Sequence, residues 1–493
     1  MRTVSALALA AALGFSALAR GQDVPLFTAD FPPDEFARRR AAVYDAIGAG
    51  AVAVVQGAPS PVGYTRFRQS NELYYLSGIE VPHAYLLLDG GQRQAMLYLP
   101  HRNAGREASE GKLLAAEDGD LVRRLAGLEH TYGTDLLAEH LARYARSPEV
   151  RTVYTPLSPA EGSATSRDLA LRAVADLAAD PFDGRPSREG HFVDLLTTRF
   201  PRYEVKDLSP VLDRLRLVKS PREIGLIRKA TRLSCLALLE SMRSTEPGVI
   251  EHELDAVAKY VYFRNGALGE AYYSLIASAE NAWYPHYNAG KRAMKDGELV
   301  LMDFAPDVGY YMSDITRMWP VNGRFSPAQR ELYGFYLSCY RAILKAIRPG
   351  ATAGAIMKEA AGEMEKVLAG TRFSKPAYEA AARDFVTRYR EAAQSRPRLG
   401  HWVGMATHDV GDDSGPLRPG MVFTIEPALR VPEEQVYIRL EDLVIVTDRG
   451  TELPSDGLPM DMAAIEKVMA EEGLLQKYPR DAAGATPPGR MDQ

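Results

Sequence analysis

Two acids lie within a run of residues that is otherwise typical of apolar strands, VLMDFAPDVGYYMSDIT from Val300 to Thr316. The Pro-Asp-Val-Gly in its middle predicts that the run turns back on itself as a hairpin. If the turn is centred between Val308 and Gly309, Asp303 and Asp314 lie directly opposite each other on the two strands. Like charges in such a pair repel each other and destabilise the hairpin. The segment therefore predicts a cation between the two carboxylates.

Two later strand-like segments carry further acids. MVFTIEPAL contains Glu426, and QVYIRLEDLVIV contains Glu441. Any one acid of this kind is more often ion-paired or exposed than functional. Four carboxylates on apolar strands, however, cannot remain ionised together without compensation, because a buried unpaired charge costs more free energy than a strand recovers. The set of four predicts a pair of divalent cations.

Nitrogen side chains near these acids could complete such a site. His401 and His408 lie in the glycine-rich segment LGHWVGMATHDVGD, just ahead of an acidic strand, and glycine allows the close backbone approach that a site wall needs. His286, in NAWYPHYNAG, is typical of a structural residue when taken alone. Arg439 precedes Glu441 by two residues, so on a strand both point to one face. We expect Arg439 to hold a metal-binding carboxylate; a surface ion pair is the alternative.

The elements that must position these residues form a repeated pattern. Ser220-Pro221-Arg222-Glu223 and Ser326-Pro327-Ala328-Gln329 each have the signature of a capping box that opens an amphipathic helix. Each of these helices should end near a Pro-Gly pair, and a second helical pattern and acid-bearing strands follow in both cases. The sequence thus predicts a duplicated unit whose two copies bring the four carboxylates together.

The preceding part of the chain, from about Pro33 to Val205, predicts a separate α/β domain. A polar stretch from Pro159 to Arg188 is typical of an insertion or a long loop and shows no pattern that indicates chemistry. We expect a helix in PPDEFARRRAAVYDAIGAG and strands in AVAVVQG, ELYYLSG, AYLLLDG, QAMLYLP and RTVYTPL.

Composition and the two ends of the chain limit the class of protein. At 493 residues, two domains are expected. Lys plus Arg (59) nearly balance Asp plus Glu (64), which argues against a nucleic-acid binder. Residues 1–19 are typical of a secretory signal peptide, with an uncleaved membrane anchor as the alternative, so we expect export and no membrane association after cleavage. Cys235 and Cys339 lie in amphipathic helical patterns and are interpreted as core residues.

Together these motifs resemble the creatinase, prolidase and aminopeptidase P family of pita-bread metallopeptidases. DFAPDVGYYMSDITRMWPVNGRFS resembles the family's first acidic hairpin, GHWVGMATHDVGD its histidine segment, and FTIEP with IRLED its two glutamate strands. YTRFRQSNELYYLSG resembles the N-terminal domain of the family members that act on X-Pro bonds. The resemblance implies an α/β (α+β) fold: a creatinase-like domain over residues 23–210 and a pita-bread catalytic domain with an internal pseudo-two-fold repeat over 211–472. The composition of residues 473–493 is typical of a flexible tail.

The resemblance also implies the roles of individual residues. His408 would stabilise the tetrahedral intermediate at the scissile bond, and His286 would help to place the substrate. One position departs from the family pattern, because Pro397 stands four residues before the ligand His, where X-Pro peptidases often carry another His. The preceding segment, RFSKPAYEAAARDFVTRYREAAQSR, is longer than usual. The implied ligands of a dinuclear centre are Asp303, Asp314, His401, Glu426 and Glu441.

The chemistry of this ligand set agrees with the resemblance. Carboxylates with one imidazole are hard ligands, which favours manganese, with cobalt, iron or zinc as alternatives. Two metals that share a water lower its pKa, so that a bridging hydroxide is available near neutral pH, and they polarise the substrate carbonyl. We expect Glu426 to shuttle the proton. The reaction would be hydrolysis of an amide bond.

Three functions remain open at this stage. The first is an exported Xaa-Pro aminopeptidase that releases the N-terminal residue of peptides with proline second, and the second is an Xaa-Pro dipeptidase of the prolidase type. The third is a metal-free creatinase-like hydrolase or a binding protein, which is disfavoured because all five ligand types are present. We expect peptide partners and a homo-oligomer.

Overall fold

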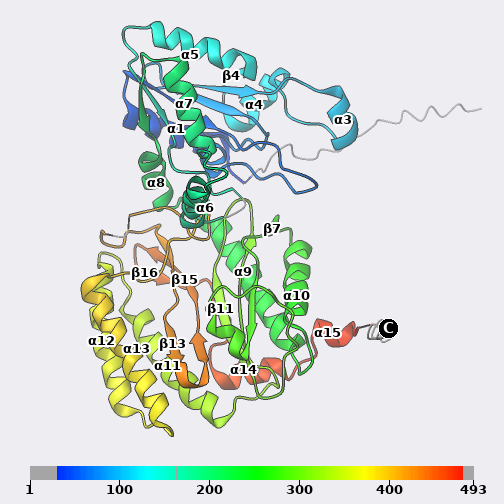
Figure 1. Ribbon diagram of the computed structural model, residues 1–493, viewed down its shortest axis with the longest axis vertical. Helices are drawn as coiled ribbons and strands as arrows, with labels where there is room; N and C mark the ends of the chain where they lie inside the picture. The colour runs from blue at the N-terminus through cyan, green and yellow to red at the C-terminus, as the bar shows by residue number, and fades with distance from the viewer. Residues whose placement is uncertain (1–29, 163–164, 413, 481–493) are drawn as a thin grey trace, which may run out of the picture.

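The computed structural model describes residues 30–162, 165–412 and 414–480, and it divides them between two domains (Figure 1). The first domain ends with α8 (Ser209–Leu217), and the second begins with α9 (Pro221–Ser244). The predicted signal peptide, residues 1–19, lies outside the described residues. No helix within the described residues is both long and apolar enough to cross a membrane.

The N-terminal domain is built on a six-stranded mixed sheet with the order β4-β3-β2-β1-β5-β6. β1 pairs antiparallel with β2 and parallel with β5, so the predicted α/β character is present. The strands are β1 (Ala51–Gln56), β2 (Tyr85–Asp89), β3 (Gln94–Leu99), β4 (His130–Gly133), β5 (Thr152–Thr155) and β6 (Glu204–Asp207). The helices are α1 (Pro33–Ile47), α2 (Asn71–Ser77), α3 (Ala104–Glu110), α4 (Gly119–Ala126), α5 (Leu137–Arg146), α6 (Arg167–Ala179), α7 (Arg188–Arg199) and α8.

One predicted strand of this domain is a helix. ELYYLSG was expected to be a strand, but it forms α2, which ends where Gly78 adopts the left-handed conformation with φ of 69°. All seven residues of α2 are buried. A short segment that is buried on every side has no polar face, so its hydrophobic pattern cannot separate a helix from a strand.

The predicted insertion or long loop from Pro159 to Arg188 was also only partly correct. It contains the 13-residue helix α6, which Ser166 caps by accepting a hydrogen bond from the Leu169 amide. Figure 1 places α6 where the two domains meet. Most of its residues are exposed, and only Arg167 and Ala170 are buried. A helix with so small a buried face has a weak apolar pattern, which explains why the sequence did not reveal it.

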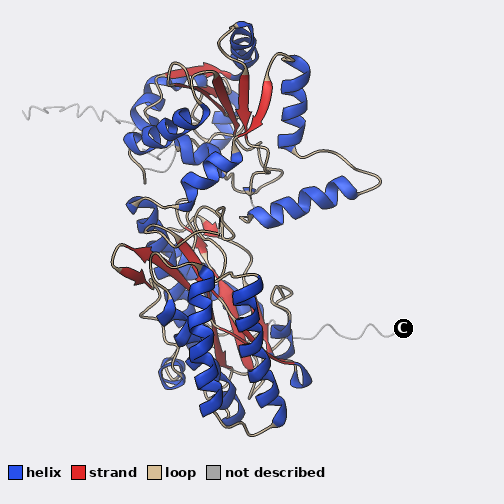
Figure 2. Ribbon diagram, turned by 90° about the vertical axis from the view of Figure 1, so that its left-hand side faces the viewer, coloured by secondary structure: helices blue, strands red, loops and turns tan. Residues whose placement is uncertain are grey.

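The C-terminal domain repeats a helix pair, as predicted. α9 is followed by α10 (Glu251–Arg264), and α11 (Pro327–Ala346) by α12 (Ala353–Gly370). Both capping boxes are formed: Ser220 and Glu223 bond each other's backbone amides, and so do Ser326 and Gln329. The segment before Pro397 forms a further helix, α13 (Pro376–Ser395). The strands lie between α9–α10 on one side and α11–α13 on the other, and the helices cover them in the second view (Figure 1 and Figure 2).

The strands of this domain belong to small sheets. One sheet has the order β11-β9-β8 and another β12-β15-β16, with two-stranded pairs β10-β7 and β13-β14 beside them. The first half contributes β7 (Gly269–Glu270), β8 (Leu275–Ser278), β9 (Leu299–Phe304), β10 (Pro306–Asp307) and β11 (Ile315–Pro320). The second half contributes β12 (Val422–Ile425), β13 (Ala428–Val431), β14 (Val436–Arg439), β15 (Asp442–Thr447) and β16 (Gly450–Glu452).

The register of the first acidic hairpin differs from the prediction. Asp303 pairs with Thr316, so Asp314 is its diagonal neighbour and does not lie directly opposite it. The turn is centred between Gly309 and Tyr310, whose φ angles are 59° and 72°. Two successive residues with positive φ are typical of a type I′ turn, which matches the twist of a hairpin. The sequence disfavours a turn centred at this position because a tyrosine rarely adopts positive φ.

Tertiary contacts hold Tyr310 in this unusual conformation. Its ring stacks on Tyr74 of α2 with the centroids 3.6 Å apart, and its hydroxyl donates to Glu80 over 2.9 Å. The same hydroxyl accepts a hydrogen bond from the Gln69 amide over 2.8 Å. These partners all belong to the N-terminal domain, so the docking of that domain sets the register of the hairpin.

The two domains also share apolar core. One cluster of buried side chains fills the C-terminal domain, whereas a second joins residues of β1, β2 and β3 to Tyr311, Met312 and Val403 of the C-terminal domain. Cys339 is buried and Cys235 is half-buried, and both are free, in agreement with their predicted role as core residues. The described start of the predicted tail forms α15 (Leu474–Lys477), where the Leu474 amide donates to Ser244 Oγ.

Candidate metal centre

The first pair of acids meets on one face of the hairpin. Asp303 lies in β9 and Asp314 immediately precedes β11. Both are buried, and the hydroxyl oxygen of Tyr272 lies 2.6 Å from Oδ1 of each. Burial, and then the charge of Asp303, raise the pKa of Tyr272 well above its ordinary value, so the phenol keeps its proton. The phenol has one hydrogen, so Tyr272 lies between the two carboxylates and donates to one of them at a time.

The second pair of acids comes from the other half of the domain. Glu426 follows β12, and Glu441 lies between β14 and β15. Glu441 and Thr316 exchange backbone hydrogen bonds, and Thr316 Oγ1 donates to Glu441 Oε2 over 2.6 Å. This bridge joins the two halves at the site. The predicted convergence of the duplicated units on one place is therefore present.

His401 faces three of the four acids. Its Nε2 atom lies 3.4 Å from Asp314, 3.4 Å from Glu426 and 4.0 Å from Glu441. Its Nδ1 atom lies 3.2 Å from the carbonyl oxygen of Trp402, which can only accept, so Nδ1 carries the proton. The Nε2 lone pair is thus directed toward the acids, as a metal ligand requires.

Burial controls the charges of this cluster. It lowers the pKa of His401 to about 4, so the imidazole is neutral near pH 7. Burial, followed by a neighbouring carboxylate, raises the pKa of Asp314 and of Glu441 well above their ordinary values. Burial also opposes ionisation of Glu426, but the nearby His401 and Arg439 hold its pKa below the usual range.

Arg439 contacts carboxylates of the predicted metal site. Its guanidinium forms an ion pair with Asp303 and lies 3.5 Å from Glu426, and it donates to Thr316 Oγ1 over 3.1 Å. The sequence indicated that Arg439 holds a carboxylate of the set, and it does. These acids lie outside β14, because the placement of neighbouring strands, and not the alternation along β14 alone, decides which side chains meet.

The two remaining predicted histidines have different surroundings. The ring of His408 lies against that of His401, with the centroids 4.0 Å apart. Its Nδ1 atom lies 3.0 Å from the carboxylate of Asp168, at the start of α6. His286 is exposed, in the segment after a short 3₁₀ helix, η4 (Ala279–Trp283). The structure brings His408 to the site and leaves His286 at the surface.

The donor set fits divalent cations. The ligand atoms of Asp314, His401 and Glu441 all lie within 4.8 Å of one another, and all three residues are buried. Carboxylate oxygens and one neutral imidazole are ligands for manganese and similar divalent metals. Cations would also offset the burial and the repulsion that together raise the pKa of Asp314 and of Glu441. The five predicted ligands, including Asp303 and Glu426, are the residues that would hold them.

Sequence reasoning missed three residues at this site. Tyr272 and Thr316 bond the acids directly, and Asp168 bonds His408. Thr316 is the last residue of the acidic segment Val300–Thr316, and its placement two residues after Asp314 puts it on the same strand face. Tyr272 and Asp168 carry no such signal, because only the folding of distant segments brings them to the site.

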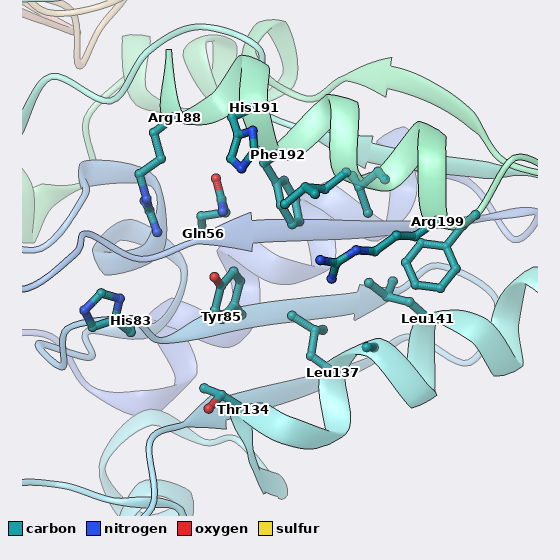
Figure 3. Close-up of a pocket in the computed structure, with 14 residues that line it drawn as sticks. Gln56, His83, Tyr85, Thr134, Leu137, Leu141, Arg188, His191, Phe192 and Arg199 are labelled. Atoms are coloured by element: carbon teal, nitrogen blue, oxygen red, sulfur yellow. The ribbon is translucent and has the colours of Figure 1, made fainter. Parts of the chain in front are cut away.

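A separate cavity of about 480 Å³ lies in the N-terminal domain, between the sheet and α5 and α7 (Figure 3). Gln56 and Tyr85 of the sheet and Arg188, His191 and Phe192 of α7 line it. It contains none of the predicted site residues. The cavity is therefore distinct from the cluster of acids.

Comparison with known proteins gives matches over both domains. Residues 225–448 match the family model "Metallopeptidase family M24", and residues 36–154 match "Aminopeptidase P, N-terminal domain". The chain is 28% identical to Xaa-Pro aminopeptidase of Escherichia coli (strain K12), over 85% of this chain and 93% of that protein. It is 31% identical to Xaa-Pro aminopeptidase 3 of Mus musculus, over 83% of this chain and 77% of that protein.

A solved structure is similar to this chain over both domains. Aminopeptidase P from E. coli with the inhibitor Pro-Leu superposes with a TM-score of 0.71 at 26% identity. The superposition covers 89% of this chain and 98% of that chain. The likeness therefore includes the N-terminal domain and the arrangement of both halves of the C-terminal domain.

Proposed function

Because the chain belongs to the metallopeptidase family M24, we propose that it is an exported, dinuclear-metal Xaa-Pro aminopeptidase. Membership of the family makes the protein a hydrolase that uses divalent metal, and it confirms the resemblance on which the predicted α/β fold rests. The Xaa-Pro aminopeptidases among its relatives match it over both domains. The proposal goes further, to two metals, the substrate and the location of the enzyme.

The arrangement around His401 carries the proposal. A neutral imidazole nitrogen faces carboxylates from both halves of a duplicated domain, in a buried position. Such a cluster of acids is destabilising without cations. The five ligands provide more oxygen atoms than a single small cation needs, and this supports a dinuclear centre.

Different side chains of the site can perform different functions in amide hydrolysis. When bound, two divalent cations would lower the pKa of a water and polarise the scissile carbonyl. Glu426 is the least buried of the four acids, with 29% of its side chain exposed, so it can accept the proton of an attacking water and pass it to the leaving nitrogen. Arg439 and Tyr272 hold the carboxylates in place.

His408 lies beside the centre and outside the ligand set. With both ring nitrogens protonated, a histidine whose Nδ1–H is held by a carboxylate can donate its Nε2–H to the oxygen that gains negative charge in the tetrahedral intermediate. We assign it this role, and assign His286 to the placement of the substrate. The exposed position of His286 is compatible with contact to an entering peptide.

The substrate follows from the combination of domains. The N-terminal domain packs beside the hairpin and the His401 segment, where it can limit the amino end of a peptide without closing the far end of the groove. Peptides longer than a dipeptide, with proline second, are therefore the proposed substrates. Pro397 packs near Gly354 in place of a polar side chain, so it cannot donate a hydrogen bond to the substrate.

The proposal also includes export of the protein and its assembly into a homo-oligomer. The signal-peptide pattern of residues 1–19 supports export to the periplasm or the medium. Exposed apolar side chains, among them Val62 and Tyr64, support a homo-oligomer. Neither a nucleic acid nor a membrane is a proposed partner.

The decisive experiment combines metal analysis with peptide cleavage. Gently purified protein should contain about two divalent ions per chain, as five hard ligands imply. With saturating manganese, catalytic efficiency should be higher for X-Pro-Y than for X-Pro, and X-Ala-Y should be cleaved poorly. A preference for X-Pro would favour a dipeptidase, and equal cleavage of X-Ala-Y would exclude proline specificity. Absence of metal, with no activity on adding manganese, would refute the proposal.

A further inference from the structure

The carboxylate of Asp168 holds one nitrogen of the His408 ring. Its two oxygens lie 3.0 and 3.2 Å from Nδ1 of His408. A carboxylate at this distance accepts, so Nδ1 carries hydrogen and donates it. On its other side the ring lies against His401. Contacts on both sides fix the plane of the His408 ring and leave Nε2 as the ring nitrogen without a partner among the residues the structure describes.

Backbone hydrogen bonds hold the two residues in this register. The Thr407 amide donates to the carbonyl of Thr165 over 2.7 Å, and the Arg167 amide donates to the carbonyl of His408 over 3.1 Å. Thr165 has a φ of 48°, a conformation that a β-branched residue rarely adopts. Such a conformation persists only where the surroundings impose it, and it is frequent at functional sites. The surroundings thus hold the backbone of Thr165, three residues before Asp168, in an unfavourable conformation.

The start of α6 orients and stabilises the Asp168 carboxylate. Asp168 is the second residue of the helix, and the capping residue Ser166 donates from Oγ to Asp168 Oδ1 over 2.7 Å. A negative charge in the first turn of a helix is stabilised by the helix dipole. The hydrogen bond with His408 is the largest of the effects that lower the pKa of Asp168 below its usual range. The carboxylate is therefore ionised at neutral pH.

Buried ion pairs anchor both neighbours of the pair. Arg167, next to Asp168, forms ion pairs with Glu72 and Glu161. Asp409, next to His408, lies 2.5 Å from Arg216, which also contacts Glu72 and Glu161. We call these five residues the interdomain ion cluster. The interdomain ion cluster joins α6 to the histidine segment. The Asp168 side chain lies outside this cluster and is 63% exposed.

We propose that Asp168, supplied by the N-terminal domain, is a positioning residue that orients His408 for the hydrolytic reaction. This inference rests on the proposed function. Asp168 does not need to touch the substrate. It acts through His408, and the active site is complete only when α6 is docked against the histidine segment.

Two variants test the role of Asp168, with Asp176→Asn as the control. Asp176 is exposed on the same helix and forms no interaction with another described residue. Asp168→Ala should lower kcat about 10- to 100-fold, the usual cost of losing such an outer partner, with little change in KM or metal content. Asp168→Asn keeps an acceptor oxygen and should retain more activity than Asp168→Ala. Asp176→Asn should behave as the wild type.

A double variant separates positioning from a structural role. In the His408→Ala background, Asp168→Ala should cause no further loss, because its partner is already absent. A further loss of the same size as in the wild type would overturn the inference. So would a wild-type kcat for Asp168→Ala, or a loss equal to that of Asp176→Asn.

A spectroscopic measurement keeps this test independent of activity. Nitrogen-15 spectra of histidine-labelled protein should show His408 protonated at Nδ1, with the signal identified by its loss in His408→Ala. Asp168→Ala should shift this signal, and Asp176→Asn should not. If the wild type cleaves no X-Pro-Y peptide, the proposed function fails, while the spectra still decide whether Asp168 holds His408. An unchanged His408 signal in Asp168→Ala would refute the inference.

Discussion

His401 and His408 lie ring against ring, yet their surroundings differ. His401 directs Nε2 at three carboxylates, whereas His408 bonds a single acid from the other domain. The first has the environment of a metal ligand. The second has the environment of a group that acts on the substrate.

Substituting each histidine should separate these roles. His401→Ala should lower the bound metal well below that of the wild type. His408→Ala should leave the metal in place and lower kcat about 100- to 1,000-fold, as expected for the loss of a donor that acts in the transition state. Elemental analysis and steady-state kinetics on one X-Pro-Y peptide provide both measurements. Equal metal loss in the two variants would contradict the assignment.

We expect both cysteines to react slowly with alkylating reagents in the folded protein. Burial raises the pKa of Cys235 to about 11 and that of Cys339 to about 12. Only the thiolate reacts with alkylating reagents, so both residues should be modified slowly at pH 8 in the folded protein. In denaturant, 2 thiols per chain should react rapidly. Mass spectrometry after timed alkylation measures both rates, and fast modification of the native protein would contradict the prediction.

At the scale of the element, the acidic hairpin depends on its turn. Gly309 and Tyr310 both have positive φ, and contacts with the N-terminal domain hold Tyr310. The turn fixes the register, and the register places Asp314 diagonally from Asp303 on one face. A slip of one residue would move every side chain of one strand to the opposite face.

Gly309→Ala tests this dependence. The left-handed conformation costs a residue with a Cβ about 1–2 kcal/mol, and the new Cβ would lie 2.6 Å from Asp30 Oδ2. We expect the free energy of unfolding to fall by at least that amount. Gly225→Ala, in α9 with no atom within 4 Å of the new Cβ, is the matched control and should be neutral or slightly stabilising. Equal stabilities of the two variants, measured by urea unfolding, would argue against the assigned turn.

At the scale of the whole molecule, the site joins three parts of the chain. Asp303 and Asp314 come from one half of the C-terminal domain, and His401, Glu426 and Glu441 from the other. Asp168 comes from the N-terminal domain. Removal of metal should therefore weaken the molecule as a whole.

Chelation should lower Tm, and the decrease should grow as pH rises above the ordinary carboxyl pKa. Without metal, burial and neighbouring charges raise the pKa of Asp314 and of Glu441, so the folded chain retains protons that the unfolded chain releases. The free energy of unfolding of the metal-free protein then falls as pH rises from the ordinary carboxyl pKa, about 4, to the raised pKa of these two acids. Bound metal compensates the charges and stabilises the folded state by mass action. Calorimetry with and without EDTA measures the difference, which added manganese should reverse; an EDTA effect that did not increase with pH would contradict this account.

Elements with strong local signals could be predicted from the amino-acid sequence alone. The capping boxes at Ser220 and Ser326 predicted the start of both long helices, because a cap depends on residues within one turn. The acids Asp303, Asp314, Glu426 and Glu441 were predicted to meet because two copies of one unit place them at equivalent positions, and this reasoning needs no coordinates. Apolar α2 was misread as a strand, since complete burial removes the periodic signal.

The side chains that complete the site are selected by contacts between distant segments of the folded chain. Tyr310 adopts positive φ because the N-terminal domain holds its ring and hydroxyl, and this sets the hairpin register. Asp168 reaches His408 across 240 residues of sequence, and Tyr272 reaches Asp314 across 42. Contacts of this kind depend on how whole elements dock. Local periodicity and capping describe the faces of single elements, and they contain no information on which distant element covers each face.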